Sequence, residues 1–274
     1  MKLSIITINY NNKDGLQKTI DSVISQSFTD FEWIIIDGGS TDGGKELIEQ
    51  YNDKISYWVS EPDKGIYNAM NKGIKVANGE YCLFLNSGDL FYNPDVLDKV
   101  NACGWNADII SGRVLNIDNG QPLHYGYNDD VVKKLLVETL NHQGSFIRKS
   151  LFDSYRYRED YEIVSDWLAW MHWLLEENCS LEYINVIVAY QEMNGISSGR
   201  NYANVIKERQ RGLDEILGVR VKETLLRLYE EQNFLEWPIV QDVRFIAFNS
   251  HYLYSCLIRF VSFLKRIYCL FNKK

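Results

Sequence analysis

The sequence predicts an α/β fold in which a mixed sheet is flanked by helices, on three observations. Short apolar runs rich in Ile recur in the first 85 residues, and each ends in a polar turn. A segment with apolar residues at helical spacing follows each of the first three turns. Strands that are apolar on both faces and alternate with helices indicate a parallel sheet covered on both sides.

The first half of the chain divides into repeated units of strand, turn and helix. The predicted strands span 3–8, 33–36, 55–59 and 81–85. Helical spacing follows the first three strands, over 16–24, 47–51 and 66–77. In each unit the unusual polar residues come directly after the strand, where open α/β sheets bind their ligands.

Beyond Pro94 the pattern is less regular and predicts mixed α and β structure. A helix to about residue 102 precedes two strands, over 108–117 and 123–127, which are joined by a turn at Asp118-Asn-Gly120. A helix over 165–177, a strand over 181–191 and helices over 200–217 and 221–232 follow. We divide the chain into 1–100, 101–235 and 236–274, the last of which is a C-terminal helical extension.

The composition is that of a globular protein with one large core. The chain has 274 residues, 46% hydrophobic content and a net charge of -8. This charge excludes nucleic acid as a first choice of partner, because phosphate binding needs clustered Lys and Arg. The five cysteines never form CxxC, so we expect neither a disulfide framework nor structural zinc. We expect no cleaved signal peptide and a cytoplasmic location.

The C-terminal extension predicts an amphipathic basic helix. Residues 245–274 carry five Lys or Arg and no acid. Arg259, Arg266 and Lys273 recur every seven residues, opposite a stripe of Leu, Ile and Phe at helical spacing. A cationic face opposite an apolar face suits peripheral contact with an anionic membrane surface. Packing on the rest of the protein, or on the partner in a homodimer, is the alternative.

Three carboxylates follow successive strands of the first half, namely Asp37, Asp63 and Asp89. The ends of parallel strands meet at one edge of a sheet, which predicts a cleft rich in carboxylates and glycine backbone. The chain has no GxxxxGK[ST] loop, and no GxGxxG follows its first strand, so a divalent cation is the natural partner for phosphates there. For each Asp taken alone, a turn former or a helix cap is the simpler explanation.

Three runs follow one another in order: IITINYNN, SVISQSFTDFEWIIIDGGSTDG and DKGIYNAMNKGIKVANGEYCLFLNSGD. Together they resemble glycosyltransferase family 2, the inverting enzymes that have a GT-A type, Rossmann-like mixed sheet and use nucleotide-sugar donors. The resemblance covers about the first 100 residues and continues more weakly through HQGSFIRKSLF and YEIVSDWLAWMHWLL. It implies that 1–100 is the nucleotide-sugar-binding half and 101–235 the acceptor-binding and catalytic-base half.

The resemblance also implies a set of contacts to the donor. Thr7 and Tyr10, at the end of the first strand, would line the pocket of the nucleotide base. Asp37 would contact the base or the ribose. Asp63, with Lys64 beside it, falls where the family commonly has a further nucleoside contact.

The family's metal-binding motif, often written DSDD, corresponds to Asn86-Ser87-Gly88-Asp89, in which only the last acid remains. One carboxylate still holds Mg²⁺ or Mn²⁺ if the donor diphosphate and waters supply the other oxygens. We therefore expect Asp89 to bind the divalent cation largely by itself. Asn86 would hydrogen-bond hydroxyls of the sugar or the ribose.

The catalytic base is expected in the second half. The resemblance implies Asp166, in the run VSDW, as the carboxylate that takes the proton of the acceptor hydroxyl. An acid that complements the helix dipole is the alternative, and Asp160 and Glu162 are rival bases. His142, in the run NHQG, would contact the donor phosphates or the metal, or is structural. Trp167, in a mainly buried group of three Trp residues, would stack on the acceptor sugar.

Together these residues predict an inverting glycosyltransferase that moves a sugar from a nucleoside-diphosphate sugar to an acceptor hydroxyl. The resemblance implies bacterial capsular, exopolysaccharide or O-antigen synthesis. The acceptor would be a glycan, or a glycan linked to polyprenyl diphosphate, at the inner face of the cell membrane. The alternative within enzymes is a nucleotidyltransferase, which would have the same kind of sheet and would also bind its nucleotide through a metal ion. A catalytically silent scaffold of a glycan-assembly complex is the alternative that the missing acids at positions 86 and 88 suggest.

Overall fold

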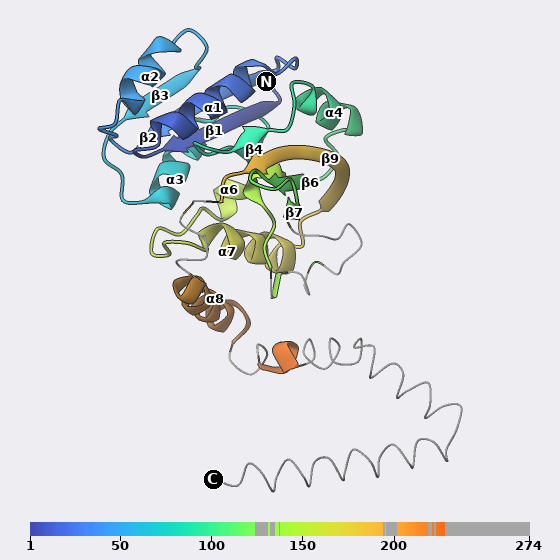
Figure 1. The fold of residues 1–274 in the computed structure, drawn as a ribbon. Helices are drawn as coiled ribbons and strands as arrows, with labels where there is room; N and C mark the ends of the chain where they lie inside the picture. Colours follow the sequence, from blue (N-terminus) through green and yellow to red (C-terminus); the bar gives the residue numbers. More distant parts are fainter. Residues whose placement is uncertain are drawn as a thin grey trace, which may run out of the picture. The chain divides into compact units, whose positions relative to one another are not determined.

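The computed structural model describes residues 1–123, 131, 135–136, 138–193, 195, 202–218, 221 and 223–227. The chain divides into two compact units, Met1–Ile216 and Leu217–Lys274. The described residues of the first unit contain one nine-stranded mixed sheet in the order β3-β2-β1-β4-β8-β6-β9-β5, with β7 paired to β6 (Figure 1). The α/β architecture that the sequence predicts is confirmed.

Four parallel strands build the first half of the sheet. They are β1 (Leu3–Asn9), β2 (Phe31–Asp37), β3 (Tyr57–Ser60) and β4 (Tyr81–Phe84). Every residue of β1 and β4 is buried, as expected for strands covered on both faces. Asn9 pairs with Asp37, and Asp37 pairs with Ser60, so the carboxyl ends of β1, β2 and β3 lie level with one another.

Helices cover both faces of these strands. The helices of the first half are α1 (Lys13–Ile24), α2 (Gly44–Gln50), α3 (Ile66–Val76) and α4 (Val96–Cys103). Leu16 of α1 and Leu47 of α2 share a buried cluster with Ile5 of β1. On the other face α3 packs closely at Gly73, where a Cβ atom would overlap Ile6. The two faces are distinct because successive side chains of a strand point to opposite sides.

The second half continues the same sheet with mixed strand directions. Its elements are β5 (Leu90–Phe91), β6 (Ile109–Asn116), β7 (Pro122–Leu123), the 3₁₀ turn η1 (His142–Gly144), β8 (Ser145–Arg148), α6 (Leu151–Ser154), α7 (Ser165–Met171), η2 (His172–Glu176), β9 (Leu181–Gln191) and α8 (Tyr202–Leu217). β8 is antiparallel to both β4 and β6, and β9 is parallel to β6. It follows that β9 ends, and β8 begins, at the edge where β1 and β4 end.

The predicted helix over 165–177 is not a continuous α-helix. The α-helical part ends at Met171, and residues 172–176 form a wider π-helical segment. There the N–H of Glu177 bonds to the carbonyl of His172 at 3.1 Å, one residue further back than in an α-helix. The wider turn accommodates Trp170 and Trp173, whose buried rings meet edge to face at 5.6 Å.

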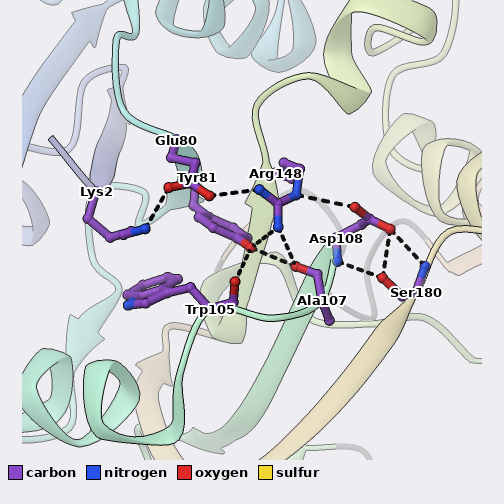
Figure 2. Close-up of polar contacts among 8 residues, drawn as sticks. All are labelled: Lys2, Glu80, Tyr81, Trp105, Ala107, Asp108, Arg148 and Ser180. Atoms are coloured by element: carbon purple, nitrogen blue, oxygen red, sulfur yellow. Dashed lines mark hydrogen bonds and ion pairs between the residues drawn. The ribbon is translucent and has the colours of Figure 1, made fainter.

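A polar network joins the two halves of the sheet at the end where β1 and β4 begin (Figure 2). It surrounds Arg148, the last residue of β8. Its guanidinium donates to Glu80 at 2.7 Å, to the Tyr81 hydroxyl at 2.6 Å and to Asp108 at 3.2 Å. Glu80 is also paired with Lys2 at 2.5 Å. Lys2, Glu80 and Asp108 directly precede β1, β4 and β6, and Tyr81 and Arg148 belong to β4 and β8. The network therefore ties four strands together, at the end of the sheet remote from the carboxyl ends of β1 and β4.

Four predicted segments lie partly or wholly outside the described residues. The predicted strand over 123–127 is described only at Leu123, the predicted helix over 200–217 from residue 202 onward, and the predicted helix over 221–232 only in part. The predicted basic helix in 236–274 is outside the described residues altogether. Among the residues that are described, no helix combines the length and the hydropathy needed to span a membrane.

Candidate active site

Two adjoining cavities open at the end of the sheet where the parallel strands β1, β2 and β4 end. The larger has a volume of about 810 Å³, and its lining includes Asn9, Tyr10, Asn12, Asp63, Asn86, Asp89, His142, Gln143 and Glu192. The smaller has a volume of about 320 Å³, and its lining includes His142, Gln143, Ile163, Asp166, Trp167 and Glu192. Because His142, Gln143 and Glu192 line both, the two cavities share one wall.

Asp89 lies on the wall of the larger cavity, at the end of the turn between β4 and β5. It is 5% exposed, and its two carboxylate oxygens accept hydrogen bonds from the Gln143 side chain at 3.1 Å and from the Glu192 backbone N–H at 2.9 Å. Burial raises the pKa of Asp89 to about 6, because these hydrogen bonds and the nearby His142 offset the lost hydration only in part. A nearby positive charge would favour its ionised form.

The turn that carries Asp89 is held by Thr19 of α1. The backbone N–H of Gly88 donates to the Thr19 hydroxyl at 3.0 Å, and this hydroxyl lies 2.9 Å from the carbonyl of Asp89. Thr19 is fully buried, so the turn is attached to the core rather than to solvent. The attachment positions Asp89 at the end of its strand.

The larger cavity is acidic. Asp63, Asp89 and Glu192 line it, and no Lys or Arg occurs among the described residues of its lining. An anionic ligand such as a diphosphate would therefore meet carboxylates without a cationic side chain, which is unfavourable unless a cation accompanies it.

His142 connects the two cavities through hydrogen bonds. Its Nε2 atom lies 3.2 Å from the Asn86 amide nitrogen, and its Nδ1 atom lies 3.2 Å from the Asp166 carboxylate. An amide nitrogen is a donor only, so Nε2 accepts from Asn86 and the ring hydrogen is on Nδ1, from where it is donated to Asp166. Asn86 thus donates to His142 and His142 donates to Asp166, whose carboxylate is the final acceptor.

Asp166, in the first turn of α7, has two further donors. The backbone N–H of Trp167 and the hydroxyl of Tyr67 each lie 2.9 Å from its Oδ1 atom, and the hydroxyl also lies 2.6 Å from the carbonyl of Ile163. Burial raises the pKa of Tyr67 well above its usual value, and the charge of Asp166 adds to the shift, so the hydroxyl remains protonated. These contacts fix the orientation of the Asp166 carboxylate.

The segment before Asp166 is held by Glu208 of α8. The Glu208 carboxylate accepts the backbone N–H groups of Glu162, Ile163 and Val164 at 2.8, 2.9 and 3.2 Å. Val164 is the N-cap of α7 and has no capping side chain of its own. Glu208 therefore supplies from another helix the acceptors that the start of α7 lacks.

Some of the residues that we predicted to contact the sugar donor line the larger cavity, and others do not. Tyr10, Asp63 and Asn86 line the larger cavity, together with Asp89 and His142. Lys64, by contrast, is exposed and outside the described lining of both cavities.

Thr7 and Asp37 are fully buried and belong to the lining of neither cavity. The Thr7 hydroxyl accepts from the Trp33 indole at 3.1 Å. Asp37 accepts four hydrogen bonds, from the Ser40 hydroxyl and N–H, the Ser60 hydroxyl and the Asn9 side chain, at 2.5 to 2.9 Å. Burial raises the pKa of Asp37, but these bonds outweigh it, so its pKa is lowered. In this structure Asp37 organises the loop beside Asn9 and Gly38, which do line the cavity.

Trp167 is buried, with 2% of its surface exposed. Its indole N–H donates to the carbonyl of Leu135 at 2.7 Å, and the Arg209 guanidinium stacks 4.8 Å from the ring centre. Trp170 and Trp173 donate in the same way to the carbonyls of Leu140 and Leu151. All three Trp residues are core residues, although Trp167 also belongs to the lining of the smaller cavity.

Gln143, Glu192, Tyr67 and Glu208 were not predicted from the sequence. Gln143 adjoins His142 in the run NHQG, so its place in a motif was a signal for it. Glu192 directly follows β9, and Asp89 lies in the turn after β4, so a carboxylate in the polar segment after a strand was a signal for both. Tyr67 and Glu208 left no such signal, because their roles depend on contacts between distant segments.

The oxygen atoms on the wall of the larger cavity are suitable ligands for a hard divalent cation. In the described part of the chain no three His, Cys, Asp or Glu side chains converge as a closed metal site. The larger cavity instead offers the Asp89 carboxylate and two amide oxygens, of Asn9 and Asn86, that are buried without a hydrogen-bond partner. Mg²⁺ and Mn²⁺ take oxygen ligands, and in nucleotide sites one or two carboxylates suffice because phosphates and waters complete the shell.

Comparisons with known proteins show the family and the fold of this chain. The model of the family Glycosyl transferase family 2 matches residues 4–156. A PGL/p-HBAD biosynthesis glycosyltransferase of Mycobacterium bovis is 30% identical over 245 residues, which are 86% of this chain and 91% of that protein. An uncharacterized glycosyltransferase of Mycobacterium tuberculosis is 46% identical over 96 residues, so this match spans 35% of the chain and 37% of that relative.

Solved structures share the architecture. TarS 1–349 of S. aureus, in complex with UDP-GlcNAc, has a TM-score of 0.63 at 17% identity, over 79% of this chain and 67% of that one. The mannosyltransferase PcManGT from Pyrobaculum calidifontis, in complex with GDP-Man and Mn²⁺, has a TM-score of 0.60 at 13% identity, over 96% and 80%. The fold is thus of the GT-A type. The chain belongs to glycosyltransferase family 2, as its motifs predicted.

Proposed function

We propose that this protein is an inverting glycosyltransferase that moves one sugar from a nucleoside-diphosphate sugar to an acceptor hydroxyl. The observation that carries the proposal is the pair of adjoining cavities, which place the Asp89 and Asp166 carboxylates on either side of His142. Asp89 lines the larger cavity and Asp166 the smaller, and His142 lines both. An inverting transfer needs this division, because the acceptor attacks the anomeric carbon on the face opposite the leaving diphosphate.

The larger cavity receives the donor. Its volume, about 810 Å³, is within the range of pockets that enclose a small-molecule ligand. Tyr10 and Asp63 contact the nucleoside, and Asn86 contacts hydroxyls of the sugar or ribose. The sugar nucleotides bound in the TarS and PcManGT structures support this class of donor.

A divalent cation, Mn²⁺ or Mg²⁺, accompanies the donor. Asp89 would hold it, with the diphosphate as a source of further oxygen ligands. When bound, the cation would supply the positive charge for the diphosphate that the described lining of the cavity, which has no Lys or Arg, does not. The Mn²⁺ that accompanies GDP-Man in the PcManGT complex supports the assignment.

Asp166 is the catalytic base. It accepts the proton of the acceptor hydroxyl while the acceptor oxygen forms its bond to the anomeric carbon. The bond from that carbon to the diphosphate oxygen breaks, and the nucleoside diphosphate leaves with the electron pair. His142 and Tyr67 orient the carboxylate through their hydrogen bonds, so that its free lone pair faces the smaller cavity.

The acceptor is a glycan, or a glycan linked to polyprenyl diphosphate, in the synthesis of a bacterial surface polysaccharide or glycolipid. The PGL/p-HBAD biosynthesis name of the mycobacterial relative supports a glycoconjugate product. We further propose peripheral contact of residues 245–274 with the inner face of the cell membrane, on the charge pattern of this segment. Deletion of these residues should release the protein from membranes, and unchanged fractionation would favour packing on the protein.

Incubation of the purified protein with sugar nucleotides and Mn²⁺ tests the function. Thermal shift first selects among UDP-, GDP- and dTDP-sugars, because a ligand of the folded state raises its stability. The proposal predicts slow release of nucleoside diphosphate by hydrolysis. Release of inorganic diphosphate from a nucleoside triphosphate would identify a nucleotidyltransferase instead, and neither reaction is expected from a silent scaffold.

A further inference from the structure

Position 88, beside Asp89, is filled by a side chain from another strand. Gly88 has a φ of +104°, and a Cβ atom at this position would overlap the carboxylate of Glu192. Glu192 directly follows β9, whereas Gly88 belongs to the turn after β4. The space that an acidic side chain at position 88 would occupy therefore already holds a carboxylate.

Glu192 is held against Asp89 by its own backbone. Its N–H donates to Oδ1 of Asp89 at 2.9 Å, so the two residues keep a fixed relation. The Asn12 amide lies 3.4 Å from the Glu192 carboxylate and also donates to the carbonyl of Ser87 at 3.0 Å. Asn12 thus connects the Glu192 side chain to the turn that bears Asp89.

Among the described residues no Lys or Arg balances this carboxylate pair, and an unpaired oxygen ligand lies on the same cavity wall. Neither the described lining of the larger cavity nor the ion pairs among described residues give Glu192 a Lys or Arg partner. Asn9, which is 3% exposed, lines the same cavity, and its amide oxygen has no hydrogen-bond partner. Two carboxylates and an unpaired amide oxygen on one wall are the oxygen ligands that a hard cation prefers.

We propose that Glu192 supplies the second carboxylate of the cation site, in place of the acid that is missing at position 88. The inference rests on the proposed function, which gives the cation its diphosphate partner. It differs from the expectation that Asp89 holds the cation largely by itself. The site would then be assembled from the segments that follow β4 and β9, which are far apart in the sequence.

The test is a titration of Mn²⁺ into the full-length protein, with free Mn²⁺ followed by electron paramagnetic resonance. The titration is done at saturating nucleoside diphosphate, using whichever of UDP, GDP or dTDP stabilises the wild type most. Four proteins are compared: the wild type, Asp89→Asn, Glu192→Gln and Glu182→Gln. Glu182 is a matched control, because it lies on β9 at the strand end remote from the site.

Glu192→Gln should weaken Mn²⁺ binding roughly tenfold or more, since loss even of groups that only orient a metal ligand typically costs 10- to 100-fold. Its affinity for the nucleoside diphosphate without Mn²⁺ should be unchanged or higher, because a negative charge has been removed near the phosphates. A misfolded variant would lose this metal-free binding as well. Glu182→Gln should behave as the wild type.

The outcomes separate this inference from the proposed function. Wild-type affinity for Mn²⁺ in Glu192→Gln, together with loss of binding in Asp89→Asn, would overturn the role of Glu192 and leave the cation on Asp89. A wild type that binds a nucleoside diphosphate but no Mn²⁺ would refute the cation site as a whole. A wild type that binds no nucleoside diphosphate would contradict the proposed function itself.

Discussion

The Nδ1 atom of His142 lies 3.2 Å from the Oδ2 atom of Asp166, and each side chain is 15% exposed. The pair joins the wall of the larger cavity, where we propose that the donor binds, to the proposed base in the smaller cavity. Because the ring hydrogen is on Nδ1, His142 orients the carboxylate through a donated hydrogen bond and also holds Asn86. The catalytic rate should therefore depend on His142 through the geometry of Asp166.

His142→Ala should lower kcat about 10- to 100-fold, a part of the 10²- to 10⁴-fold that a general base contributes. The KM for the donor should change little, because Asp89 and the nucleoside contacts remain. Steady-state hydrolysis of the sugar nucleotide with Mn²⁺ measures both constants. His172→Ala is the matched control, since His172 pairs with Glu176 and Glu177 outside the described lining of both cavities. Equal kinetics of the two variants would contradict the role of His142.

Glu208→Ala should destabilise the protein and slow catalysis together. Three backbone N–H groups before α7 lose their acceptor, which should lower the free energy of unfolding by about 2 kcal/mol. The proposed base Asp166 follows this segment closely, so kcat should fall as well. Urea unfolding and steady-state kinetics check the two effects. Glu49→Ala, an exposed carboxylate on α2, is the control, and a Glu208 variant with unchanged kcat would refute the positioning role.

Arg148→Met should affect stability but not the active site. The variant leaves Glu80, Asp108 and the Tyr81 hydroxyl without their shared donor, at the edge opposite the cavities. We expect the free energy of unfolding to fall by about 1–3 kcal/mol. Breaking a fully buried ion pair would cost more, but solvent screens these partly exposed charges. Lys99→Met removes an exposed pair with Asp95 and should cost about 0.5 kcal/mol or less. Equal losses in the two variants would contradict a specific role of the Arg148 network.

The stability contributed by Glu32 should depend on pH in a defined direction. Burial raises the pKa of Glu32, but hydrogen bonds from the Ser4 hydroxyl and the backbone of Asn78 and Gly79 outweigh it, so the net pKa is lowered. A group with a lowered folded-state pKa stabilises above its unfolded value, 4.5, and loses this contribution as the pH falls through its folded value.

Wild type and Glu32→Gln should accordingly differ most at neutral pH. We expect about 1–3 kcal/mol at pH 7, with the difference shrinking below pH 4.5. Urea unfolding at a series of pH values measures it, with Glu46→Gln as an exposed control. A difference that grows as the pH falls would show that the sign is wrong.

The regular half of the fold and the main carboxylates could be predicted because their signals are local. The apolar run before Asn86 ends in a polar turn, and strand ends of a parallel sheet meet at one edge, which brought Asp63 and Asp89 to one cavity. The alternation of side chains along a strand predicted less clearly which residues at a strand end face the cavity. Thr7 and Asp37 are also at strand ends, but they face the interior, whereas the adjacent Ile8 and Gly38 line the cavity.

The residues that were missed depend on long-range pairing. Glu192 reaches Asp89 only because β9 runs parallel to β6, a direction that neither segment encodes alone. Tyr67 reaches Asp166 from α3, and Glu208 reaches the start of α7 from α8. Trp167 was expected to stack on a sugar, but a buried ring and a paired indole N–H are set by packing that the sequence pattern does not reveal.

The role of Asp166 as base is the central claim, and one comparison tests it most directly. Hydrolysis of the selected sugar nucleotide with Mn²⁺, and binding of its nucleoside diphosphate, are measured for the wild type, Asp166→Asn and Glu162→Gln. Glu162 is exposed and outside the described lining of both cavities. Asp166→Asn should lower kcat about 10²- to 10⁴-fold, with nucleotide binding near that of the wild type and Glu162→Gln fully active. Substantial turnover in Asp166→Asn would contradict the account.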